Sequence, residues 1–174
     1  MRRVVITLAL LGVVAQSGAD IRKDGKDYAL STKDCPWELR FPRKNWKVGI
    51  NELKGAQSYM LFTNDSARLT VSFWIEPATK CSSSEACREL VWSTLPKPGT
   101  PQGVAQFTQA DFAIVRYDFP RLADLPISQL NYSGHLVRDG FWVDMHISAP
   151  LWTEKEEKAM QSFVDTITIQ QVAR

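Results

Sequence analysis

The stretch HLVRDGFWVDMHIS, residues 135–148, contains the strongest β-hairpin signal of the sequence. Asp139 and Gly140 stand at its centre, and an Asp-Gly pair suits a type I′ turn because both central residues of that turn need a positive φ. Apolar and polar residues alternate on either side of the pair. We therefore predict two antiparallel strands, over residues 130–137 and 141–148, joined by a two-residue loop.

The length of this loop predicts the register of the hairpin. A two-residue loop places His135 opposite Asp144. The next pair on the same face is Ser133 with His146, since cross-strand partners point to one side of a sheet. One face is apolar and is expected in the core; it contains Tyr132, Gly134, Leu136, Phe141, Val143, Met145 and Ile147. The other face is mixed; it contains Ser133, His135, Val137, Trp142, Asp144 and His146.

The mixed face would bring His135, Asp144 and His146 together. Two imidazoles and a carboxylate are ligand types for zinc or another divalent transition metal, which could be bound or used for hydrolysis. The same residues also fit a polar sheet face with a cross-strand His–Asp hydrogen bond. This simpler interpretation is favoured, because a patch on two strands leaves the coordination of a metal incomplete. A register shifted by one residue would abolish the cluster.

Further strands and two helices are predicted on both sides of the hairpin. The other segments that alternate like strands are residues 37–41, 59–63, 69–76, 104–108 and 112–119. Ser82 with Glu85, and Thr153 with Glu156, have the form of capping boxes that begin helices. The predicted fold class is α+β, with an antiparallel sheet of about six to seven strands and helices packed on it.

Composition divides the chain into three parts. Residues 1–19 combine Arg2 and Arg3 with a long apolar run and small residues at its end, which predicts a cleaved secretory signal peptide. Residues 20–34 are polar and are expected to be loose, and residues 35–174 are expected to form one domain. The two arginines account for the whole formal net charge of +2, so a neutral mature protein is expected and nucleic acid is not a favoured partner. We expect a periplasmic or secreted monomer without a membrane span, with an unknown protein or small molecule as its partner.

Three cysteines in an oxidising compartment permit one disulfide and three possible pairings. We favour Cys81 with Cys87, which would tie a loop to the first turn of the helix that follows. This pairing would leave Cys35 outside the bridge.

A second candidate site combines aromatic and charged residues. The candidate residues are assigned to the outward face of the sheet, together with the mixed face of the hairpin; they are Trp74, Glu76, Arg116, Asp118 and Trp142. Such groups on one face can form a ligand cleft or a protein contact. The alternative is that a second layer covers Trp74 and Trp142 while the charges lie at its rim.

Five stretches carry a resemblance to a known family; they are ARLTVSFWIEPA (67–78), SSEACRELVWSTL (83–95), AIVRYDF (113–119), HLVRDGFWVDMHIS (135–148) and EEKAMQSFVDTITI (156–169). In their order and residue pattern they resemble the PsbP-like fold family, which is named for an extrinsic subunit of photosystem II. The resemblance implies an α/β/α sandwich around an antiparallel sheet, and a binding or assembly-accessory role. The chain differs from lipoprotein members of that family because no cysteine directly follows its apolar run.

Common enzyme motifs are absent from the sequence, including a Gly-x-Ser-x-Gly elbow, a phosphate-binding glycine loop, His-Glu-x-x-His and Cys-x-x-Cys. We therefore expect a non-catalytic extracytoplasmic binding or assembly-accessory protein without a cofactor. The alternative is a metal-binding or metal-dependent hydrolytic protein that uses His135, Asp144 and His146.

Overall fold

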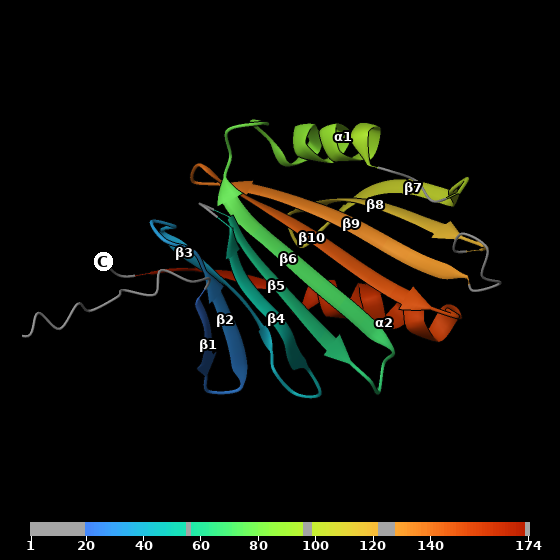
Figure 1. Cartoon of the computed structure of the whole chain (residues 1–174), viewed down its shortest axis with the longest axis horizontal. Coiled ribbons are helices and arrows are strands. Elements are labelled where there is room, and N and C mark those ends of the chain that lie inside the picture. The colour runs from blue at the N-terminus through green and yellow to red at the C-terminus, as the bar shows by residue number, and fades with distance from the viewer. Residues whose placement is uncertain (1–19, 55–56, 96–98, 122–127, 173–174) are drawn as a thin grey trace, which may run out of the picture.

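The computed structural model describes residues 20–54, 57–95, 99–121 and 128–172, which form two antiparallel sheets and two helices (Figure 1). The predicted α+β class is confirmed, as is an antiparallel sheet with helices packed on it. The expected signal peptide, residues 1–19, lies outside the described residues.

The larger sheet has seven strands in the order β4-β5-β6-β10-β9-β8-β7. These strands are β4 (Lys47–Lys54), β5 (Gln57–Asn64), β6 (Leu69–Pro77), β7 (Gln102–Gln109), β8 (Phe112–Phe119), β9 (Gln129–Arg138) and β10 (Phe141–Pro150). The predicted hairpin is β9 and β10, with Asp139 and Gly140 at φ values of 48° and 78°. Its predicted register is confirmed, with His135 opposite Asp144.

The smaller sheet has four strands in the order β1-β2-β3-β11. These strands are β1 (Asp20–Asp24), β2 (Asp27–Ser31), β3 (Trp37–Pro42) and β11 (Thr168–Gln171). Residues 20–34 are therefore not loose, because β1 and β2 form a hairpin that pairs with β3. Tyr28 and Leu30 of β2 are buried in the core, and this burial orders an otherwise polar segment.

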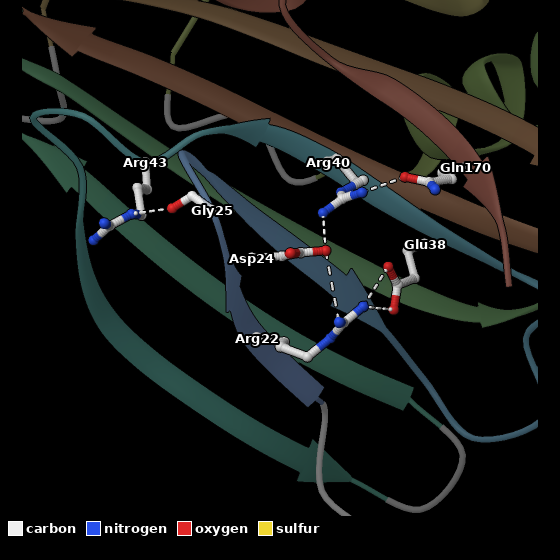
Figure 2. A network of polar contacts seen from close by, with 7 residues as sticks. All are labelled: Arg22, Asp24, Gly25, Glu38, Arg40, Arg43 and Gln170. Carbon is white, nitrogen blue, oxygen red and sulfur yellow. Dashed lines mark hydrogen bonds and ion pairs between the residues drawn. The ribbon is translucent and has the colours of Figure 1, made fainter.

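Charged side chains connect the strands across the outer side of the smaller sheet (Figure 2). Arg22 of β1 pairs with Glu38 of β3, with Nη2 and Oε1 2.6 Å apart. Arg40 of β3 contacts Asp24 of β1 and also Gln170 of β11. Exposed ion pairs are individually weak, but these contacts link three strands and help to hold the polar edge strand β1.

A hydrophobic core lies between the inner face of the larger sheet and a second layer, which the smaller sheet and α2 (Glu154–Asp165) form together. Its buried side chains come from both layers, among them Phe41 of β3, Phe73 of β6 and Phe163 of α2. The helix α1 (Ser84–Thr94) packs on the opposite, outer face, over β8 and β9. The seven-stranded sheet is therefore the middle of three layers.

The two helices begin at serine or threonine caps. Thr153 and Glu156 form the predicted capping box of α2. The N-cap of α1 is Ser83 rather than Ser82, because Oγ of Ser83 accepts the backbone N–H of Ala86 over 3.1 Å. Neither described helix is long and apolar enough to cross a bilayer.

The predicted disulfide joins Cys81 to Cys87, whose Cα atoms are 5.2 Å apart. Cys87 is buried in the first turns of α1, so the bridge fastens the segment after β6 to the helix. Cys35 is buried away from this bridge.

Candidate ligand-binding site

Aromatic and acidic side chains alternate on the outer face of the larger sheet, where β6 pairs with β10. Glu76 lies opposite Trp142, and Trp74 lies opposite Asp144. Since residues i and i+2 of a strand share a face, the four side chains form a square with the indoles on one diagonal and the carboxyls on the other. Tyr59 of β5 extends the aromatic row, with its ring centroid 4.5 Å from that of Trp74. Trp74, Glu76 and Trp142 thus share one face, as predicted.

Two pockets open on this face and meet at Trp74 and Asp144. The first, here called the lysine pocket, has a volume of about 200 Å³ and is lined by Gln57, Trp74, Glu76, Lys80, Trp142 and Asp144. The second, the histidine pocket, has a volume of about 300 Å³ and is lined by Tyr59, Ser72, Trp74, Val91, Leu95, Tyr117, Ser133, Asp144 and His146. The helix α1 covers the outer face of β8 and β9. The pockets lie beside this helix, on the part of the face that includes β6.

The lysine pocket holds the ammonium group of Lys80, from the segment between β6 and α1. Nζ of Lys80 lies 3.1 Å from Oε1 of Glu76 and 5.8 Å from the centroid of the Trp142 ring. Nε2 of Gln57 donates a hydrogen bond to Oε2 of Glu76. Glu76 is only 8% exposed, and a carboxylate this buried needs such partners. The pocket therefore places an ammonium group between an acid and an aromatic ring.

His135 is fully buried beneath this face and serves a structural purpose. Its Nδ1 accepts a hydrogen bond from Nε1 of Trp142 over 3.3 Å, and its Nε2 lies 3.0 Å from Oγ of Ser133. Burial lowers the pKa of His135 to about 4, with a smaller effect of the positive charge of Arg88. Oδ1 of Asp144 is 3.7 Å from Nδ1, beyond hydrogen-bond distance. The expected His–Asp hydrogen bond is therefore replaced by one from Trp142.

Asp144 is the titratable group that the two pockets share. Its side chain is 26% exposed to solvent. Burial raises the pKa of Asp144 to about 7, repulsion from Glu76 also raises it, and the charge of Lys80 lowers it. The charge of both pockets consequently changes near neutral pH.

His146 lines the histidine pocket without completing a metal site. Burial lowers the pKa of His146 to about 4, and its ring forms no hydrogen bond with another described residue. Among the described residues, no three His, Cys, Asp or Glu side chains are placed to hold a metal ion. The predicted ligand set of His135, Asp144 and His146 is therefore not assembled, and Trp142 occupies the lone pair of Nδ1, the His135 nitrogen that lies 3.7 Å from Asp144.

Arg116 and Asp118 lie on the opposite face of the sheet, which corrects their predicted grouping with Trp74. Arg116 is in register with Tyr132, which belongs to the inner core. There its guanidinium lies 3.0 Å from Glu157 of α2 and 2.9 Å from Asp118. The prediction failed because β8 carries apolar residues on both faces, so that its alternation does not reveal which face turns toward α1.

Sequence reasoning did not include Gln57, Tyr59, Lys80 and Val91 in the site. Tyr59 could have been found, because its strand alternates and pairs with the strand of Trp74. Lys80 and Val91 carry no comparable signal, since their positions depend on how the segment after β6 and the helix α1 return over the sheet.

No protein-family model matches this chain, and a search of the curated proteins finds no significant match. The fold and the two pockets therefore define its class: an α+β protein with a pair of small pockets on the outer face of an antiparallel sheet.

Proposed function

We propose that this chain is a non-catalytic extracytoplasmic binding or assembly-accessory protein, and that its ligand contacts the outer face at Trp74. The observation that carries the proposal is the pair of pockets that meet at Trp74 and Asp144. The histidine pocket, with a volume of about 300 Å³, reaches the lower end of the range typical of small-ligand sites, and the adjoining lysine pocket adds about 200 Å³. Aromatic walls with a few polar groups also match the usual composition of such sites.

Partly exposed side chains in the histidine pocket support binding. Trp74 and Tyr59 are half-buried, and their rings, in contact at a tilt of 35°, offer apolar area to the pocket that they line. The ring of His146 lines the same pocket and forms no hydrogen bond with another described residue. It could therefore donate to or accept from a ligand without breaking an internal contact.

The state of the other histidine supports a structural role for His135 rather than a catalytic one. His135 is committed to Trp142 and Ser133, and its lowered pKa of about 4 leaves it uncharged near neutral pH. An efficient general acid or base has a pKa near the working pH. The location is supported by the disulfide between Cys81 and Cys87, since disulfides persist in oxidising compartments. The assembly-accessory part rests on the resemblance to PsbP-like proteins.

The proposal is tested by titrating the ¹⁵N-labelled protein with n-butanol, butyrate, n-butylamine and p-cresol while the indole and backbone N–H resonances are followed. We expect at least one probe to shift the Trp74 resonance saturably, and Trp74→Ala to abolish the shifts that the same probe causes at the backbone amides of the other pocket residues. The matched control is Trp152→Phe, because Trp152 stacks on Arg116 at the other face. Four probes without a saturable shift at Trp74 would overturn the proposed site.

A further inference from the structure

The lysine pocket already accommodates one ammonium group, that of Lys80. This ammonium is held by an ion pair of 3.1 Å with Glu76 and by a ring contact of 5.8 Å with Trp142. The Lys80 side chain is nevertheless 56% exposed, so it lines the pocket without being buried in it. Because the lysine end of both contacts is exposed to solvent, releasing it costs less than breaking a fully buried pair. An ammonium group from outside can therefore compete for the same place.

The charges that remain when Lys80 leaves favour a cation. Lys80 is the one basic residue among the described residues that line the pocket, whereas Glu76 and Asp144 are acidic. Without Lys80, the buried carboxylate of Glu76 would lack its counter-ion. Glu76 and Asp144 stand diagonally between the indoles of Trp74 and Trp142, so a cation there would meet a ring face and a carboxylate together.

The fold allows the Lys80 side chain to leave the pocket without a movement of the backbone. Its neighbour Cys81 is fastened to α1 through the disulfide with Cys87. On the other side, the backbone N–H of Ala78 donates to the carbonyl of Gly140 over 2.8 Å. The backbone around Lys80 is thus held at both ends while its side chain is largely in solvent. A change of side-chain rotamer would take the Lys80 ammonium away from Glu76 and Trp142 while the backbone stays in place.

We propose that the lysine pocket is a binding site for a primary alkylammonium group, and that Lys80 is its intramolecular competitor. The assignment rests on the proposed function and names the ligand chemistry of that face. A primary ammonium is favoured because its N–H groups can donate to Glu76 as those of Lys80 do. A short alkyl chain suits the indole walls and the volume of about 200 Å³.

The test removes the competitor and supplies its side chain in solution. In Lys80→Ala the chain is truncated at Cβ, and n-butylamine carries an ammonium on a chain of the same length as the original side chain. We expect n-butylamine to bind Lys80→Ala saturably, with a shift of the Trp142 indole resonance, about tenfold more tightly than it binds the wild type. That ratio is the expected cost of breaking one ion pair and one cation–π contact whose lysine end is exposed.

Three controls isolate the chemistry. Lys158→Ala removes another exposed lysine, which pairs with Glu154 on α2, and should keep the wild-type affinity for n-butylamine. Glu76→Gln in the Lys80→Ala background should lose the binding. Neutral n-butanol should not shift Trp142 in either protein.

The source of the ammonium is distinguished by comparing n-butylamine with a blocked Gly-Lys-Gly peptide. Tighter binding of the peptide assigns the pocket to a lysine side chain of a partner, and tighter binding of the amine assigns it to a small molecule. Absence of saturable n-butylamine binding to Lys80→Ala would overturn the inference. If n-butanol, butyrate or p-cresol still shifts Trp74 in that case, the proposed binding function stands and only the ammonium site is rejected. If no probe shifts Trp74, the proposed function and the ammonium site are both rejected.

Discussion

The indole nitrogen of Trp142 donates a hydrogen bond to Nδ1 of His135 over 3.3 Å, between neighbouring strands of the larger sheet. An indole N–H can only donate, so Nδ1 carries the lone pair and the proton is on Nε2. That proton is directed to Oγ of Ser133, 3.0 Å away. Both nitrogens of a fully buried imidazole are thus satisfied inside the sheet, which makes His135 a fixed support for the wall of the lysine pocket.

Substitution of this imidazole should destabilise the protein. His135→Phe keeps a planar ring but leaves Nε1 of Trp142 and Oγ of Ser133 without their partner, so we expect the free energy of unfolding to fall by roughly 2–4 kcal/mol. Guanidinium chloride titration followed by circular dichroism measures it. His146→Phe is the matched control, because the half-buried His146 forms no hydrogen bond with another described residue. Equal losses in the two variants would contradict the role of His135.

The carboxyl of Asp144 should reduce stability as the pH rises. Its pKa is about 7 in the folded protein, against an ordinary value of 3.8, and burial is the main cause. The folded state therefore binds more protons than the unfolded state between these values, so the stabilising effect of the bound proton is lost as the pH rises toward 7. At pH 8 we expect the free energy of unfolding of Asp144→Asn to exceed that of the wild type by at least about 1 kcal/mol. At pH 4 the two values should be nearly equal. A difference independent of pH would disprove this.

The carboxylate of Glu156 should have the opposite pH dependence. Hydrogen bonds from Thr153 and Arg68 lower the pKa of Glu156 to about 2. Its stabilising effect is consequently complete above about 4.5, the ordinary value, and is lost as the pH falls toward 2. We expect Glu156→Gln to lower the melting temperature at pH 7 and to match the wild type near pH 2. Glu154→Gln in the same turn, which breaks only an exposed pair with Lys158, should change little at either pH.

Arg116 should matter for stability and not for the pockets. Its guanidinium joins Glu157 of α2 to Asp118 of β8 on the inner side of the sheet. Arg116→Met keeps the aliphatic stem, so we expect a loss of roughly 1–3 kcal/mol from the broken charged hydrogen bonds. Denaturant unfolding measures the loss, and the Trp74 indole resonance should respond to ligands as in the wild type. A weakened response of the Trp74 resonance in Arg116→Met would contradict this prediction and indicate that Arg116 contributes to the binding face.

Local signals in the sequence determined several parts of this structure. The Asp139-Gly140 pair predicts the hairpin and its register, because a type I′ turn admits one pairing of the flanking strands. The capping box at Thr153 and the disulfide between Cys81 and Cys87 are also local. Each of these features depends on residues a few positions apart in the sequence. Such contacts can therefore be predicted without the rest of the fold.

Tertiary structure alone decided the remainder. The residues of β1 look like a loose polar segment in the sequence. They are ordered because β1 pairs with β2 and β2 pairs with β3, a strand that lies later in the chain. The face of β8 that carries Arg116 could not be assigned, since apolar residues occupy both of its faces. The pockets appear only when α1 and Lys80 return over the sheet. Alternation along a strand defines two faces, but the layers that pack against it decide which of them is core and which can bind a ligand.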